Sequence, residues 1–187
     1  LGIPAENTVL VCVGRLAEEK NIQELLKLRA SLGSRPVTLL LVGDGPDRAR
    51  LERVAHDLRL EAPAVIFAGM VAPEEVPDWY RLGDLFVSAS SSETQGLTYI
   101  EALAAGVPAL CRADPCLEGV IQDGENGWQY HSCLLYTSPS PRRRPMRLSA
   151  AGRRRARSSS PPSDSPSGWS ASIRHSWPGG RHVTYRG

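Results

Sequence analysis

Short apolar runs alternate with segments of helical period along the first 132 residues, and this alternation constrains the fold more than any other feature. The run from Thr8 to Gly14 is β-branched and apolar until it ends in glycine, which is typical of a strand buried on both faces. Segment 21–30 follows, with its leucines mostly on one helical face. Strands that alternate with helices need parallel crossovers. The sequence therefore predicts an α/β fold, a doubly wound parallel sheet covered by helices on both faces.

The same alternation continues as far as residue 111. The expected strands are 8–14, 37–42, 64–68, 84–88 and 107–111, and the expected helices are 21–30, 46–58, 73–82 and 97–105. Pro46 suits the first turn of its helix, where the missing N–H costs nothing. The sequence thus divides into a domain over residues 1–132 and a tail over residues 133–187.

The charge of the chain is unevenly divided between these two parts. Residues 1–132 contain 11 Lys and Arg against 19 Asp and Glu, a net charge of −8. Residues 133–187 contain 11 Arg, no Lys and one acidic residue, a net charge of +10. The whole-chain value of +2 therefore describes neither part, and nucleic-acid binding inferred from a basic surface is excluded for the first part.

The tail is rich in Ser, Pro and Arg and shows neither helical nor strand periodicity. Because such a composition buries too little apolar surface to offset chain entropy, we expect the tail to be disordered. Its guanidinium groups could pair RNA phosphates. However, residues 133–142 resemble a translated sequencing-adapter peptide, and Lys is absent from the tail. These observations favour an artefact or frameshift, so we expect no nucleic-acid partner.

Several patterns bear on the location of the protein. No apolar run approaches the roughly 20 residues that a membrane-spanning helix needs. The chain begins at Leu1 without a signal-peptide pattern, and we expect it to be a piece of a larger protein. Cys12, Cys111 and Cys116 lack companions at zinc-binding spacing, which predicts reduced thiols and a cytoplasmic protein.

Residues 93–101, Glu-Thr-Gln-Gly-Leu-Thr-Tyr-Ile-Glu, place two carboxylates eight positions apart around Gly96, where a helix is predicted to begin. The first N–H groups of a helix are unpaired and the helix dipole is positive there, so this end suits a phosphate. A carboxylate accepts paired hydrogen bonds from neighbouring hydroxyls. The combination indicates a sugar nucleotide, although either glutamate alone would be interpreted as a solvated residue or a dipole partner.

Four motifs together carry a family resemblance. They are Gly14-Arg-Leu-Ala-Glu-Glu-Lys20, Val42-Gly-Asp-Gly-Pro46, Glu93-x7-Glu101 and Ala105-Gly-Val-Pro108. Through them residues 9–130 resemble the C-terminal, donor-binding half of a glycosyltransferase family 4 enzyme, one Rossmann-like half of a GT-B fold. The resemblance implies a retaining enzyme that transfers a hexose from a UDP-sugar. The variant with Gln95, where the family usually has Phe, resembles bacterial glucosyltransferases that act on diacylglycerol.

The resemblance implies three catalytic residues, Glu93, Arg15 and Lys20. It assigns Arg15 and Lys20 to the donor diphosphate, where fixed cations would stabilise the charge on a departing UDP. Arg15 follows the first strand at the carboxyl edge of the sheet, where ligands bind in open α/β folds. Glu93 would contact the hydroxyls of the transferred sugar. For Lys20, beside a helix start whose dipole disfavours a cation, an ordinary surface charge is the alternative.

The resemblance also implies a set of donor-binding residues. Glu101 would hold the ribose hydroxyls, while Gly43 and Gly45 would form a close-approach turn near the nucleotide. The full set is Gly14, Gly43, Gly45, Gly96, Leu97, Thr98 and Glu101. No Asp-x-Asp motif occurs, which predicts an enzyme without a metal, and no other cofactor is expected.

Two other classes of function stay open from the sequence. One is a sugar-nucleotide-binding module without catalysis, because residues 1–132 hold only the donor side of a GT-B enzyme. The other is RNA binding through the tail. For the enzyme, we expect the N-terminal half of the GT-B fold in the same polypeptide and a membrane lipid as acceptor. That acceptor would bring a cytoplasmic protein to the inner face of the membrane.

Overall fold

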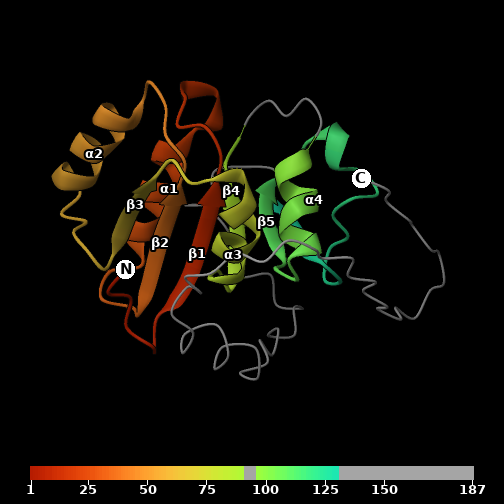
Figure 1. Cartoon of the computed structure of the whole chain (residues 1–187), viewed down its shortest axis with the longest axis horizontal. Helices are drawn as coiled ribbons and strands as arrows, with labels where there is room; N and C mark the ends of the chain where they lie inside the picture. The colour runs from red at the N-terminus through yellow and green to blue at the C-terminus, as the bar shows by residue number, and fades with distance from the viewer. Residues whose placement is uncertain (91–95, 131–187) are drawn as a thin grey trace.

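In residues 1–90 and 96–130, which the computed structural model describes, six strands form one parallel sheet with helices around it (Figure 1). The predicted tail and Glu93 lie outside these residues. The strands are β1 (Thr8–Val13), β2 (Val37–Val42), β3 (Val65–Gly69), β4 (Leu85–Ser88), β5 (Ala109–Arg112) and β6 (Gly127–Tyr130). The helices are α1 (Ile22–Ser31), α2 (Arg48–Asp57), α3 (Val76–Arg81) and α4 (Leu97–Ala104), with 3₁₀ turns η1 (Glu18–Lys20), η2 (Pro73–Glu75) and η3 (Pro115–Leu117).

The strand order is β3-β2-β1-β4-β5-β6, with every neighbouring pair parallel. The chain first builds outward from β1 through β2 to β3, and then returns to place β4 on the other side of β1. All strands therefore end at the same edge, and the direction of winding reverses between β1 and β4. This order confirms the predicted α/β class and the Rossmann-like sheet.

Both faces of the sheet are buried because successive residues of a strand face opposite helical layers. Val9 and Val11 of β1 pack in a cluster with side chains of α3 and α4, whereas Leu10 packs with side chains of α1 and α2. Figure 1 shows α3 and α4 in front of the sheet and α1 behind it. This two-sided burial explains why the central strands read as continuous apolar runs.

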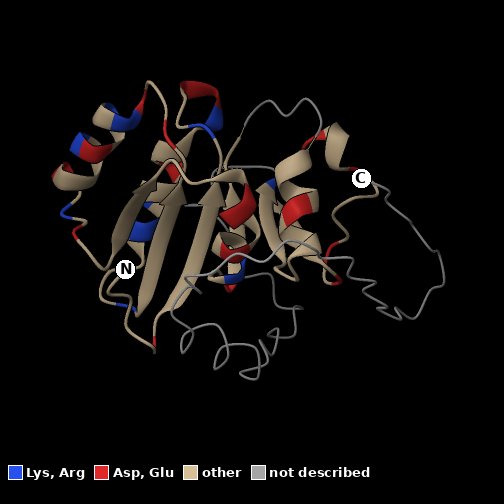
Figure 2. Ribbon diagram, in the orientation of Figure 1, with Lys and Arg blue, Asp and Glu red and all other residues tan. Residues whose placement is uncertain are grey.

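Most charged residues lie on the helices and loops, and β1, β2, β3 and β4 contain none (Figure 2). Helix α2 shows the contrast most clearly, because only Leu51 and Ala55 of its side chains are buried. Among the residues that the structure describes, no helix has the length and apolar character needed to cross a bilayer.

The structure differs from the sequence prediction in three elements. It adds β6, which pairs with β5 from Ala109–Gly127 to Arg112–Tyr130. This strand is short and stands at the edge of the sheet, so it lacks the apolar run that marks the central strands. Helix α2 begins at Arg48 rather than at Pro46, because the Asp47 carbonyl accepts the Leu51 N–H at 3.0 Å as an i→i+4 hydrogen bond. The predicted helix 73–82 is divided into η2 and α3.

Candidate functional site

A cavity of about 180 Å³ opens where β1 and β4 end. It is lined by residues of β1, the loop after β1, η1, α1, β4 and α4: Cys12, Val13, Gly14, Arg15, Lys20, Ile22, Phe86, Ser88 and Thr98. This position is the point at which the winding of the sheet reverses. In open α/β sheets, diverging loops at that point leave a crevice, and ligands bind there.

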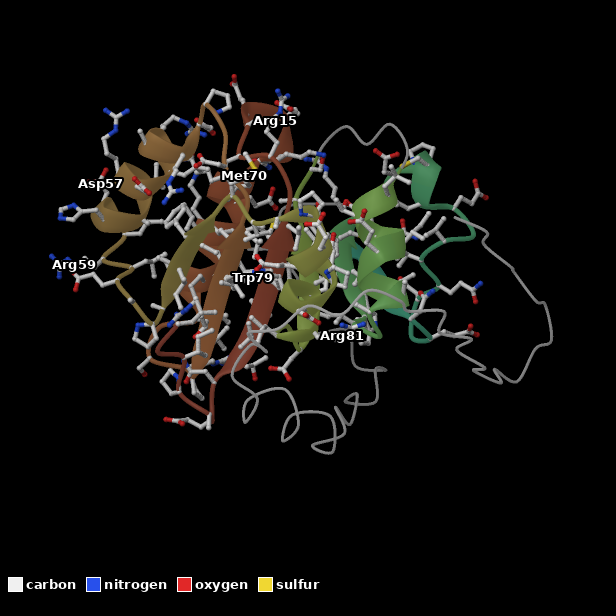
Figure 3. The ribbon with its side chains drawn as sticks, viewed as in Figure 1. Arg15, Asp57, Arg59, Met70, Trp79 and Arg81 are labelled. Atoms are coloured by element: carbon white, nitrogen blue, oxygen red, sulfur yellow. The ribbon has the colours of Figure 1, made fainter. Side chains whose placement is uncertain are left out.

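Two cationic side chains, Arg15 and Lys20, reach the rim of this cavity. The Arg15 side chain is 66% exposed and donates a hydrogen bond of 2.6 Å to Oε1 of Glu19. That hydrogen bond holds the pKa of the Glu19 carboxyl below its usual value. Figure 3 shows Arg15 at the upper edge of the molecule, beyond the end of β1. The guanidinium is therefore held near the cavity but stays open to a ligand that arrives from water.

Gly14 exposes the backbone of the loop after β1 to the cavity. Its φ is +144°, and a Cβ at this position would meet no atom within 4 Å. Only glycine adopts such a conformation at little cost. A ligand can thus approach the Gly14 backbone without meeting a side chain.

Gly43 and Gly45 do not line the cavity, and their turn beside the nucleotide stays a prediction. They pack against the loop after β1: a Cβ at Gly43 would overlap the Gly14 carbonyl oxygen, and one at Gly45 would overlap that of Leu16. The Leu16 N–H also donates to the Asp44 carbonyl at 3.0 Å. These two glycines therefore hold in place the loop that carries Arg15.

Gly43→Ala is expected to lower the free energy of unfolding by about 2–3 kcal/mol. The alanine would have to adopt the positive φ of Gly43, +126°, and its Cβ would overlap the Gly14 carbonyl oxygen. Gly106→Ala is the matched control, since Gly106 also has a positive φ, +79°, but its Cβ would meet no atom within 4 Å. For the control we expect a loss of about 1 kcal/mol. Urea unfolding of both variants measures the difference, and equal losses would contradict the packing role of Gly43.

The N-terminus of α4 lies beside the cavity and carries Gly96, Leu97 and Thr98. Gly96 is the N-cap residue, with φ +62°, and its carbonyl accepts the Tyr99 N–H at 3.1 Å. Thr98 is half-buried and lines the cavity, whereas Leu97 is 56% exposed. The backbone N–H groups of a first helical turn lack intrahelical acceptors and mark the positive end of the helix. This end can therefore receive an anion bound in the cavity.

Glu101 lies one turn further along α4, outside the set of residues that line the cavity. Its carboxylate is on the surface, where Oε2 accepts a hydrogen bond of 2.9 Å from the hydroxyl of Tyr80. Tyr80 itself is buried in the core between α3 and the sheet. Burial, followed by the Glu101 hydrogen bond, raises the pKa of the Tyr80 phenol. Tyr80 thus packs in the core and also holds the Glu101 carboxylate.

The described residues contain free cysteines and no metal cluster. Cys12, Cys111 and Cys116 are free thiols. In residues 1–90 and 96–130, no group of three or more His, Cys, Asp or Glu side chains could hold a metal ion.

The family of the chain follows from its match to a protein-family model. The model described as "Glycosyl transferases group 1" matches residues 1–133. The chain belongs to this family. Among curated proteins, it is 41% identical over 133 residues to the alpha-monoglucosyldiacylglycerol synthase of Streptococcus pneumoniae. That match covers 70% of this chain and 30% of the synthase, so the chain spans less than a third of the length of that relative.

Solved structures of glycosyltransferases share the fold. HepE of Anabaena in complex with UDP-glucose is 26% identical with a TM-score of 0.60, and the match covers 67% of this chain and 35% of HepE. The C-terminal domain of the group 1 family protein LpcC from Francisella tularensis is 27% identical with a TM-score of 0.58. The second match covers 66% of this chain and 67% of the LpcC domain.

In this glycosyl transferase domain the predicted site residues occupy three places. Gly14, Arg15, Lys20 and Thr98 meet at the cavity. Gly96, Leu97 and Glu101 lie on α4 without lining it, and the pair Gly43 and Gly45 supports the loop after β1. Glu93 belongs to the segment 91–95, which lies outside the described residues. Sequence reasoning also missed Ser88, a cavity residue whose position as the last residue of a strand is its only signal.

Proposed function

We propose that this domain binds the UDP-sugar donor of a retaining hexosyltransferase that transfers glucose to diacylglycerol. The observation that carries the proposal is the cavity at the reversal of the sheet, where an open glycine backbone meets Arg15 and Lys20. A pyrophosphate needs such neighbouring donors and cations. The HepE complex supports UDP-glucose as the ligand, and the name of the pneumococcal relative supports glucose and diacylglycerol.

The side chains around the diphosphate stabilise its negative charge. Arg15 and Lys20 hold its negative charge, which increases as the bond between the sugar and UDP breaks. Cations already in place stabilise this developing charge without reorganisation, which is usually the largest contribution to such catalysis. The amino end of α4 adds the positive end of its dipole. This chemistry needs no metal ion and no further cofactor.

In the proposed transfer, the acceptor hydroxyl oxygen forms a bond to the anomeric carbon on the side from which UDP departs. The bond from that carbon to the UDP oxygen breaks, and the leaving phosphate takes the proton of the acceptor hydroxyl. Attack and departure on one face retain the anomeric configuration. Glu93 orients the hexose through its hydroxyls. Glu101 binds the ribose, with its carboxylate fixed by Tyr80.

The acceptor site lies outside this domain in the proposed enzyme. We propose that an N-terminal GT-B half in the same polypeptide supplies it, and that the enzyme works in the cytoplasm at the inner face of the membrane. The chain alone then binds the donor without transferring the sugar. Nucleic acid is not a proposed partner.

Titration calorimetry of the 187-residue chain tests the donor assignment. We expect UDP to bind with a Kd of about 0.1–1 mM, which corresponds to about −5.4 to −4.1 kcal/mol. Glu101→Ala is expected to weaken the binding of UDP by about 1–2 kcal/mol, because hydrogen bonds to the ribose are lost. Glu93→Ala should leave UDP binding unchanged and weaken only the additional binding of UDP-glucose, because its partner is the hexose.

Glu125→Ala is the control for this experiment, since Glu125 is an exposed carboxylate in the loop before β6. The affinities of the Glu125→Ala variant for UDP and UDP-glucose should equal those of the unchanged chain. Equal losses for both ligands in the Glu93 variant would contradict the proposed division between the two carboxylates. Glucosyl transfer by the chain alone to diacylglycerol in vesicles would contradict the need for a second half.

A further inference from the structure

We infer that Ser88 donates a hydrogen bond to the diphosphate of the bound nucleotide and that Tyr99 is the residue that positions it. This inference rests on the proposed function, because it takes the cavity to be the diphosphate site. It assigns a binding role to the last residue of β4, which no sequence motif indicates, and a positioning role to a core tyrosine of α4.

Ser88 is a buried polar residue in the wall of the cavity. It is 8% exposed and lines the cavity together with Gly14, Arg15 and Lys20. Its neighbours within the strand, Phe86 and Val87, are apolar and pack into the two cores. A polar side chain at this position is therefore not required by packing, and burying its hydroxyl is costly unless the hydroxyl is hydrogen-bonded.

The hydrogen bonds around Ser88 leave its own proton for a ligand. Oγ of Ser88 accepts a hydrogen bond from the Tyr99 hydroxyl at 2.8 Å and one from the Ser90 N–H at 3.3 Å. A serine hydroxyl has two acceptor lone pairs and one donor proton, so these two bonds fill its acceptor capacity. Among the described residues, no acceptor for the Ser88 proton is found. Within residues 1–90 and 96–130, the capacity of this hydroxyl that stays unused is thus a donor at the cavity.

The surroundings of that donor select an anionic acceptor. The polar side chains that line the cavity with Ser88 are those of Arg15, Lys20 and Thr98, together with the Cys12 thiol, and none is a carboxylate. A phosphate oxygen accepts hydrogen bonds only, so it matches a wall of donors and cations. A sugar hydroxyl would also need an acceptor, which this wall offers less well.

Tyr99 reaches Ser88 from behind the cavity. It is 1% exposed, is absent from the cavity lining and packs edge-on against Phe86 with ring centroids 5.4 Å apart. Its hydroxyl therefore acts on a ligand in the cavity through Ser88. Because Tyr99 donates to Oγ, it fixes the rotation of the serine hydroxyl and increases the strength of the bond that the serine gives.

Titrations of the full chain with UDP and with uridine, followed by NMR, test this inference. For Ser88→Ala we expect the affinity for UDP to fall about tenfold, as for one lost hydrogen bond to a charged group, and the affinity for uridine to stay unchanged. Tyr99→Phe should reduce the UDP affinity about threefold through the lost orientation of Ser88. In the double variant, Tyr99→Phe should add nothing to the loss from Ser88→Ala, because both act through the same hydroxyl.

Tyr130→Phe is the matched control, because the Tyr130 hydroxyl donates to the Ser88 carbonyl at 3.4 Å rather than to Oγ. It should leave the UDP affinity unchanged. The inference is overturned if Ser88→Ala binds UDP as tightly as the unchanged chain, if uridine loses affinity equally, or if Tyr130→Phe matches Tyr99→Phe. Each of these results leaves the proposed function intact. If the unchanged chain binds no UDP, the proposed function fails as well.

Discussion

Replacing Arg15 and Lys20 together by alanine is expected to weaken UDP binding by about 100-fold, which is close to 3 kcal/mol. Both side chains line the cavity, and each would give a charge-assisted hydrogen bond to the diphosphate. Uridine, which has no phosphate, should bind the double variant as it binds the unchanged chain. Raising the salt concentration should weaken UDP binding more for the unchanged chain than for the variant, because salt screens the attraction between the two cations and the diphosphate.

The control for this prediction is Arg35→Ala combined with Arg81→Ala. Arg35 precedes β2 and Arg81 ends α3, so both lie near the amino ends of the strands, opposite the cavity. Figure 3 shows Arg81 at the lower edge of the sheet and Arg15 at the upper edge. The two double variants change the net charge equally. Equal losses of UDP affinity would mean that the general charge of the protein, rather than the cavity, governs binding.

Phe86→Ala is expected to lower the free energy of unfolding by about 4 kcal/mol, from the lost transfer energy and the space left in the core. Phe86 is 1% exposed, and its ring meets Tyr99 at 5.4 Å and Tyr80 at 5.7 Å between centroids. Aromatic pairs of this kind contribute about 0.5–1.5 kcal/mol beyond burial. Since a domain of this size has a total stability of about 5–15 kcal/mol, the variant should be close to unfolding.

Phe67→Ala is the natural comparison, because the chain contains only two phenylalanines. Phe67 lies on β3, at the edge of the sheet, and is half-buried. Its replacement should cost about 1–2 kcal/mol, as expected for less apolar surface removed from the core. Urea unfolding of the two variants provides the measurement. A loss for Phe67→Ala equal to that for Phe86→Ala would contradict the central position of the Phe86 cluster.

The central strands could be predicted from the sequence because their burial leaves a direct mark on composition. Strands β1 and β2 are covered by helices on both faces, so nearly every residue in them is apolar. Strand β6 has no such mark, because Gly127-Trp-Gln-Tyr130 is short and stands at an edge. Its identity as a strand depends on pairing with β5, which is a contact between distant segments.

The candidate site was predictable to the extent that topology alone locates it. Arg15 follows a central strand and Thr98 lies in the first turn of a helix, and parallel winding brings both to the same edge. The contacts between side chains of different elements could not be read from the sequence. The bond from Tyr80 to Glu101 joins α3 to α4, and that from Tyr99 to Ser88 joins α4 to β4. The packing of Gly43 on Gly14 likewise depends on the pairing of β1 with β2.

Amide chemical-shift mapping of UDP on the 187-residue chain tests the central claim most directly, because it locates the ligand as well as detecting it. We expect saturable shifts concentrated at Gly14, Arg15, Lys20 and Thr98, with a half-saturation of about 0.1–1 mM UDP. Uridine should shift these amides far less. Shifts confined to the Arg-rich residues 142–157, or no saturable shift around the cavity, would contradict the claim that this domain binds a nucleotide diphosphate at the end of β1.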